Sequence, residues 1–127
     1  MRFLDSDVMV DLLRRHGPAL EWFASLTEEP ALPGFVMLEL MEGCRNLREM
    51  DDLLASTKEF EIFWPGEKDL NEALAAFPRA YLAHGMDMLD ALIGACAIGH
   101  GAILCTFNQK HYRAVPRLKT EMPYNRD

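Results

Sequence analysis

Residues 102–107 form a continuous apolar run, Ala-Ile-Leu-Cys-Thr-Phe, between Gly101 and Asn108. A run of this kind is typical of a β-strand that is buried on both faces. Such strands belong to parallel sheets, because the crossover connections of a parallel sheet place helices on both of its sides. The run therefore predicts an α/β fold in which short strands alternate with helices.

The rest of the chain fits this alternation. Further strands are expected over residues 2–4, 31–32, 60–64 and 118–122, with helices over residues 8–15, 18–26, 35–44, 47–56, 70–81 and 87–99. The prediction is a central, mostly parallel sheet of about four to five short strands. With 127 residues, half of them hydrophobic, the chain is long enough for one domain that spans residues 1–127.

Composition narrows the functional classes. No stretch approaches the roughly 18 apolar residues of a membrane span, and Asp5 interrupts the start before a signal peptide can form. The three cysteines lie in apolar segments without metal-binding spacing, which indicates a reducing compartment, so we expect a cytoplasmic protein. The net charge of −7 argues against binding nucleic acid by phosphate neutralisation alone. It does not exclude a nuclease, because carboxylates that hold metal ions add negative charge at the site.

Three acidic residues, Asp5, Glu39 and Asp90, stand where an element begins or meets the sheet. Asp5 ends the first expected strand, and ligands of open parallel sheets bind beyond the carboxyl ends of the strands, at a topological switch point. The alternative is that Asp5, Ser6 or Asp7 only caps the next helix. One cap is enough for that helix, which leaves two of these residues for another role.

Helical periodicity places the other two acids. Glu39 falls on the border of the apolar face of its helix, whereas Glu42 falls deeper in the polar face. Asp90 shares a row with the small Gly94 and is expected at the seam between helix and sheet, while Asp87 is the expected N-cap. Carboxylates gathered in one place repel one another, and a hard divalent cation such as Mg²⁺ removes that repulsion.

The order of these residues resembles the PIN domain family, and within it the VapC-type toxins of bacterial and archaeal toxin–antitoxin pairs. Residues 4–8, Leu-Asp-Ser-Asp-Val, are similar to an opening hydrophobic-Asp-Thr-Asn motif, and Glu39-Leu40 with Gly43 is similar to a Glu-Leu-x-x-Gly helix. Residues 90–97, Asp-Ala-Leu-Ile-Gly-Ala-Cys-Ala, are similar to an Asp-Ala-Leu-Ile-Ala-Ala-x-Ala signature, and residues 104–108 to a late Thr-x-Asp/Asn motif. The motifs follow in the same order over nearly the whole chain.

This resemblance implies a Mg²⁺- or Mn²⁺-dependent ribonuclease with a three-layer α/β/α sandwich, usually a homodimer and silenced by a cognate antitoxin. Asp5, Glu39 and Asp90 carry over as catalytic acids and metal ligands, with Asn108 as a further site residue and Ser6 in place of the Thr beside the metal. The implied partners are RNA, the antitoxin and a second copy of the chain, with no membrane. Many members have an acid where this chain has Asn108, so we expect a second metal to bind weakly or only with RNA present.

Two other functions remain open on the sequence alone. Asp5-Ser6-Asp7 also resembles the start of aspartate-nucleophile phosphatases, in which Asp5 would form a phosphoaspartate. Those enzymes continue with x-Thr or x-Val and need a later lysine, neither of which is recognisable here. The other function is a degenerate PIN-like domain that only binds a partner, which the neutral Asn108 would fit but the three retained acids oppose.

Overall fold

Short strands and helices alternate along the chain in the computed structural model, which describes residues 1–126. The strands are β1 (Arg2–Leu4), β2 (Leu32–Pro33), β3 (Ile62–Phe63), β4 (Ile103–Cys105) and β5 (Lys119–Glu121). The helices are α1 (Ser6–Leu13), α2 (Gly17–Ser25), α3 (Gly34–Glu42), α4 (Leu47–Thr57), α5 (Glu67–His84) and α6 (Met88–Gly99), followed by a 3₁₀ turn, η1 (His111–Ala114). Every element expected from the sequence is present, with boundaries that differ by a few residues.

The strand pairs within residues 1–126 are all parallel. β4 lies between β1 and β5, and β2 pairs with β3. A bridge between Phe3 and Ala31 joins the two sets, and the Leu4 N–H donates to the Ala31 carbonyl at 3.1 Å. The order across the molecule is therefore β3-β2-β1-β4-β5. The order changes direction between β1 and β4, and this is the topological switch point of the sheet.

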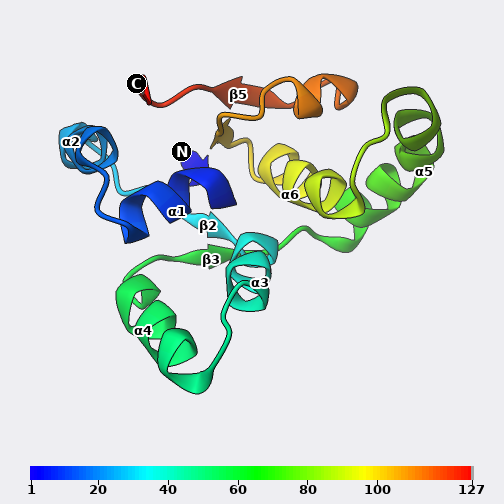
Figure 1. The fold of residues 1–127 in the computed structure, drawn as a ribbon. Helices are drawn as coiled ribbons and strands as arrows, with labels where there is room; N and C mark the ends of the chain where they lie inside the picture. Colours follow the sequence, from blue (N-terminus) through cyan, green and yellow to red (C-terminus); the bar gives the residue numbers. More distant parts are fainter. Residues whose placement is uncertain (127) are drawn as a thin grey trace.

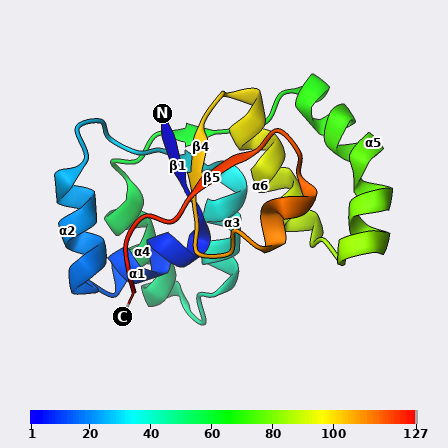
Figure 2. The same ribbon diagram turned by 90° about the horizontal axis from the view of Figure 1, so that it is seen from above.

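Helices flank the strands on both sides, which confirms the expected α/β sandwich (Figure 1). The two ends of the molecule are formed by α2 and by α5, and both views agree on this arrangement (Figures 1 and 2). Between them, Phe3 and Leu4 of β1 and Leu104 and Cys105 of β4 have no exposed surface. The strand predicted from the apolar run at residues 102–107 is therefore present as β4, and it is buried on both faces.

The chain passes directly from β2 into α3. Pro33 is both the last residue of the strand and the N-cap of the helix. Gly34 is required at this junction, because a Cβ there would collide with the indole ring of Trp64. The close approach of that ring explains why the glycine lies inside the first turn of a helix.

The expected apolar face of α5 is wider than the surface that covers it. Ala80 is buried, but Leu74 is 72% exposed and Tyr81 is 56% exposed. The helix also continues through Pro78, the expected kink, from Glu67 to His84. Periodicity identified the apolar positions, but the neighbouring α6 packs against only one side of them (Figure 2).

The cysteines lie inside the fold, as their apolar sequence context predicts. Cys96 and Cys105 are buried and Cys44 is partly buried, and all three thiols are free. Burial raises the pKa of the Cys96 and Cys105 thiols to about 12, which keeps both unreactive at neutral pH.

Within residues 1–126, no helix combines the length and the hydropathy that crossing a lipid bilayer requires.

Candidate functional site

The candidate site begins where β1 and β4 end side by side. Asp5 follows β1, and Thr106 follows β4. The two strand ends are joined because the Asp5 N–H donates to the Cys105 carbonyl at 3.0 Å. The sequence placed Asp5 beyond the end of a strand, and the fold adds that this end lies at the switch point, where open parallel sheets bind ligands.

Asp5 is held by three donors although it is only 3% exposed. Its Oδ1 accepts the Ser6 N–H at 2.8 Å, which makes Asp5 the N-cap of α1. Its Oδ2 accepts the hydroxyl of Thr106 at 2.8 Å and that of Tyr112 at 3.1 Å. Asp5 therefore caps the helix with one oxygen and meets the side chains of the site with the other, so the cap does not exclude a role in the site.

Tyr112 connects Asp5 to Asp90. The turn η1 directs Tyr112 inward, where it is 2% exposed, and its hydroxyl lies 3.4 Å from Asp90 Oδ1 as well as next to Asp5. Asp90 stands in the first turn of α6 behind Asp87, and the Asp87 side chain accepts the Leu89 N–H as N-cap. The expected division between a capping Asp87 and an inward-facing Asp90 is confirmed.

Electrostatics relate Glu39 to the same acids. Burial, together with the negative charges of Asp5, Asp87 and Glu39, raises the pKa of Asp90 to about 6, although the hydrogen bond from Tyr112 lowers it. Glu39 is half-buried on α3, which packs against α6, the helix that carries Asp90. The fold therefore brings Glu39 within electrostatic range of Asp90, while the neighbouring Glu42 is exposed, as the helical wheel predicts.

Asp7 is a further acid in this region, and the sequence analysis assigned it no site role. Its Oδ2 accepts the Phe107 N–H at 2.9 Å and the Asn108 side-chain amide at 3.3 Å. The Thr106 hydroxyl lies 3.4 Å from the same oxygen. Burial, and then the negative charge of Asp5, raise the pKa of Asp7 to about 6. Asp7 thus ties the first turn of α1 to the segment that leaves β4.

The donor set of the site suits a hard cation. Asp5, Glu39, Asp90 and Asn108 offer only oxygen donors or a neutral amide, which are the ligand types that Mg²⁺ and Mn²⁺ prefer. The raised pKa of Asp90 reflects, in part, a repulsion that a cation would relieve. In residues 1–126, no three His, Cys, Asp or Glu side chains stand in an arrangement that would hold a metal ion. Hydroxyl groups bridge the acids instead.

Sequence reasoning missed the two hydroxyl residues and Asp7. Thr106 had a visible signal, since it is the polar residue in the apolar run at residues 102–107. Tyr112 had none, because its role depends on how η1 packs against α5 and α6. Asp7 was recognised as one polar residue more than a cap requires, but its contact with Asn108 follows from the pairing of β1 with β4.

A family model supports the resemblance that the motifs suggested. The model described as PIN domain matches residues 2–117, which include Asp5, Glu39, Asp90 and Asn108. The chain belongs to the PIN domain family. A comparison with curated protein sequences, by contrast, finds no match.

Solved structures share the fold of this PIN domain at low sequence identity. VapBC2 from Rickettsia felis, bound to a DNA fragment from its promoter, has a TM-score of 0.78 and 21% identity over 94% of this chain and 96% of the other. DNA-bound VapBC from Salmonella typhimurium has a TM-score of 0.79 and 16% identity over 94% and 96% of the two chains. A toxin–antitoxin complex from Klebsiella pneumoniae has a TM-score of 0.76 and 19% identity over 98% and 99%. At such identities, the likeness shows a common fold.

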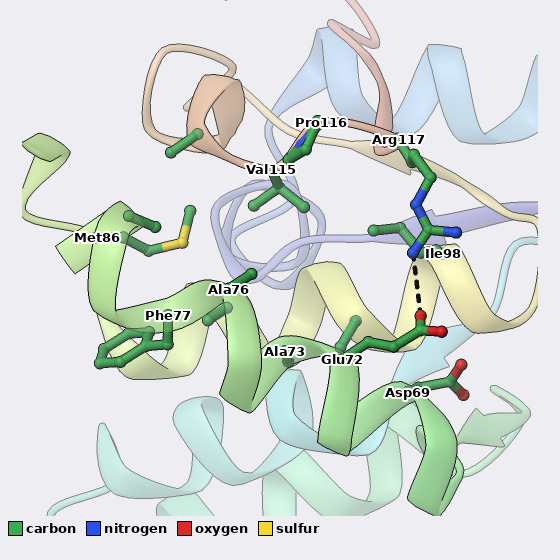
Figure 3. A pocket seen from close by; sticks show the side chains of 14 residues that line it. Asp69, Glu72, Ala73, Ala76, Phe77, Met86, Ile98, Val115, Pro116 and Arg117 are labelled. Atoms are coloured by element: carbon green, nitrogen blue, oxygen red, sulfur yellow. Dashed lines mark hydrogen bonds and ion pairs between the residues drawn. The ribbon is translucent and has the colours of Figure 1, made fainter.

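This PIN domain also has a cavity of about 110 Å³ that the acids of the site do not line. It lies between α5, α6 and the segment after η1, with apolar walls that include Phe77, Met86 and Val115 (Figure 3). Arg117 Nη2 donates to Glu72 Oε2 at 3.0 Å at one edge. Its walls are mostly apolar, and its two acids are engaged, Glu72 with Arg117 and Asp69 with the Gly66 N–H, so the acids at the switch point are the better candidate.

Proposed function

We propose that this PIN domain is a divalent-metal-dependent endoribonuclease of the VapC type, a cytoplasmic toxin that a cognate antitoxin neutralises. The observation that carries the proposal is the meeting of Asp5 and Asp90 at the Tyr112 hydroxyl, beside the switch point of the sheet. Family membership supports the nuclease class. The toxin–antitoxin complexes among the solved structures of similar fold support the VapC type.

The proposed chemistry is hydrolysis of RNA phosphodiesters. Asp5, Asp90 and Glu39 are the residues that would hold Mg²⁺ or Mn²⁺, with Asn108 and Ser6 as neutral donors beside them. A bound ion would acidify a water, polarise the phosphoryl group and stabilise the charge that develops on its oxygens.

The chain's own part is to orient these carboxylates. The hydroxyls of Thr106 and Tyr112 fix Asp5 Oδ2 before any ion or substrate arrives, and the Ser6 N–H fixes the other oxygen. A preorganised carboxylate does not have to reorient during the reaction, which is the main electrostatic advantage of an enzyme over water. The burial of Asp5 also keeps bulk water from screening its charge.

Basic residues near the acids suit an RNA backbone. Lys110, His111 and Arg113 are exposed on and beside η1, the turn that buries Tyr112. They provide local positive charge on a chain whose net charge is −7. Contacts of this kind position a phosphate backbone without reading its sequence.

Two separate apolar surfaces fit the two protein partners. Leu47 is 75% exposed on α4 and Leu54, seven residues later on the same helix face, is 44% exposed, and we assign this leucine surface to the antitoxin. Leu74 and Tyr81 are exposed on α5, and we assign them to a homodimer interface. Exposed apolar clusters on a small domain mark sites of protein interaction.

Each surface supplies the control for the other. Leu74→Glu is expected to convert the dimer to a monomer in sedimentation velocity without weakening binding of the antitoxin. The antitoxin probe is the product of a short reading frame sought beside the gene for this chain. Leu47→Glu is expected to weaken antitoxin binding and leave the dimer intact. A wild-type protein that sediments as a monomer at high concentration would contradict the dimer.

The nuclease is tested with purified protein, structured RNA and Mg²⁺ or Mn²⁺. Cleavage is expected to stop with a chelator and to fall by at least about a hundredfold in Asp90→Asn or Glu39→Gln, since removing a carboxylate removes a ligand for the ion. Glu42→Gln is the matched control, because Glu42 is exposed on the same helix as Glu39. Cleavage that survives both the chelator and Asp90→Asn would be a contaminant and would count against the proposal.

The alternatives give different results in the same experiment. A PIN-like domain that only binds a partner would retain antitoxin binding, with no cleavage by the wild type under any metal. An aspartate-nucleophile phosphatase would release phosphate from a chromogenic phosphomonoester and leave RNA intact. The PIN family match does not favour the phosphatase, and the several donors on Asp5 leave its Oδ2 engaged instead of free for nucleophilic attack. The retained Asp5, Glu39 and Asp90 oppose a domain that only binds a partner.

A further inference from the structure

Asp7 and Asn108 form an acid–amide pair at the end of β4. Asn108 Nδ2 donates to Asp7 Oδ2 at 3.3 Å, and the Phe107 N–H donates to the same oxygen at 2.9 Å. In the motifs that this chain resembles, an amide stands at the position of Asp7, and an acid often stands at the position of Asn108. The acid and the amide are therefore in contact with each other and have exchanged places.

The pair is connected to Asp5 through Thr106. The Thr106 hydroxyl donates to Asp5 Oδ2 at 2.8 Å and lies 3.4 Å from Asp7 Oδ2. A hydroxyl carries one proton, so Thr106 donates it in the shorter contact, to Asp5 Oδ2. The Thr106 oxygen accepts the backbone N–H of Asn108 at 3.0 Å. A shift of Asp7 or Asn108 is thereby transmitted to the hydroxyl that orients Asp5.

The charge of Asp7 is not neutralised by an ion pair within residues 1–126. The guanidinium of Arg126 binds the Asp11 carboxylate and donates to Asp7 at the backbone carbonyl, and its positive charge lowers the pKa of the Asp7 side chain without forming an ion pair with it. Asp5, beside Asp7, forms no ion pair within the same residues either. Neighbouring carboxylates without a cationic partner are an arrangement that favours an external divalent ion.

We infer that Asp7 supplies the fourth carboxylate of the candidate metal site, in place of the acid that is missing at Asn108, and acts as a positioning residue through Thr106. This inference rests on the proposed function. It leads to a different expectation from weak binding of a second metal, because the missing charge would come from α1 instead of from the end of β4. It also explains why residue 108 is an asparagine, since an acid there would place a second carboxylate at hydrogen-bond distance from that of Asp7.

The test is a calorimetric titration of Mn²⁺ into the RNA-free full-length chain and four variants. Asp7→Asn is expected to lower Mn²⁺ affinity by about tenfold or more, the usual effect of losing a residue that orients metal ligands. Asn108→Asp is expected to lower the melting temperature without Mn²⁺ and to recover it with Mn²⁺. The exchanged double variant, D7N/N108D, is expected to return to within about threefold of wild-type affinity, because the pair again has one acid and one amide.

Asp69→Ala is the control for lost stability alone. Asp69 accepts the Gly66 N–H at the start of α5 and contacts none of the site acids, so its loss is expected to lower the melting temperature while Mn²⁺ affinity stays at the wild-type value. Circular dichroism establishes that each variant is folded, and if Asp7→Asn does not fold, the comparison of Asn108→Asp with D7N/N108D decides instead. Wild-type affinity in Asp7→Asn, or a double variant no better than the folded single variants, would overturn the inference and leave the nuclease standing. A wild type that binds no Mn²⁺ would overturn both.

Discussion

The Tyr112 hydroxyl donates to Asp5 Oδ2 at 3.1 Å in the interior of the protein, where both side chains are almost fully buried. The same hydroxyl lies 3.4 Å from Asp90, so one neutral group stands between two like-charged carboxylates. Burial and the neighbouring carboxylates raise the pKa of this phenol well above its ordinary value, which keeps its proton available as a donor. Without a cation, this proton is what reduces the repulsion between the two acids.

Tyr112→Phe tests that role directly. The variant leaves a buried carboxylate with one donor fewer, and we expect the free energy of unfolding to fall by about 2 kcal/mol in the presence of a chelator. Mn²⁺ is expected to restore most of this loss, because a bound cation neutralises the same carboxylates. Thermal denaturation with chelator and with Mn²⁺ measures both quantities.

The matched control is Tyr81→Phe, which removes a hydroxyl from an exposed tyrosine on α5. We expect this control to melt like the wild type under both conditions. An equal loss of stability for Tyr112→Phe with and without Mn²⁺ would show that the hydroxyl supports only the packing of η1.

Asp90 gives the metal-free protein a defined dependence on pH. Its pKa is about 6 in the folded protein, against 3.8 ordinarily, so between these values the folded state holds a proton that the unfolded state has lost. Stability from this group is therefore fully present below about pH 4 and declines as pH rises through 6. Asp7 has a raised pKa as well and shifts stability in the same direction.

Asp90→Asn removes this dependence at one position. With a chelator present, the variant should match the wild type near pH 4 and melt higher at pH 7.5. After discounting for solvent at a half-exposed side chain, we expect a gain of about 1 kcal/mol, or roughly 2–6 °C. Melting curves across this range provide the measurement. A difference that does not change with pH would mean that Asp90 titrates near its ordinary value.

Periodicity explains why so much of this fold was predictable. The apolar run at residues 102–107 can be satisfied only by a strand with cover on both faces, and the helical wheel separated Asp90 from Asp87 without any structure. These features depend on residues that lie close together in the sequence. The same is true of Asp5, whose position at the end of a strand follows from its immediate neighbours.

The contacts between distant segments were not predictable in this way. Tyr112 reaches Asp5 only because η1 packs against α5 and α6, and Asp7 reaches Asn108 only because β1 and β4 are neighbours in the sheet. Strand order is not encoded in any local pattern. The apolar face of α5 shows the same limit, because periodicity cannot tell how much of that face its neighbour α6 covers.

Gly99 controls the N-terminal cap of a different helix. The Asp69 carboxylate accepts the Gly66 N–H at 2.8 Å at the start of α5, and a Cβ on Gly99 would collide with that carboxylate. Gly99→Ala is therefore expected to cost about 1 kcal/mol by displacing the cap, despite the higher helix propensity of alanine. In an Asp69→Ser background, the same change should become neutral or stabilising, since the larger carboxylate is gone.

Urea denaturation of the four proteins in this cycle gives the coupling energy. Gly17→Ala is the control, because a Cβ at Gly17 meets open space in the first turn of α2. A loss from Gly99→Ala that is the same in both backgrounds would assign it to α6 itself.

Tyr124 fastens the C-terminal segment over the outer edge of the candidate site. Its hydroxyl donates to Asp11 Oδ2 at 2.7 Å, and its ring packs edge-on against Phe107 with centroids 4.9 Å apart. Because the Phe107 N–H donates to Asp7, this packing supports the turn that holds Asp7.

Tyr124→Ala is expected to lower the free energy of unfolding by about 2 kcal/mol through the lost ring contacts and hydrogen bond. It should also speed hydrogen exchange at the Phe107 amide by at least about tenfold more than at the core amide of Leu104. Met122→Ala, an exposed change two residues away, is the control and should alter neither rate. Equal acceleration at Phe107 and Leu104 would mean that the variant lowers global stability without loosening this turn in particular.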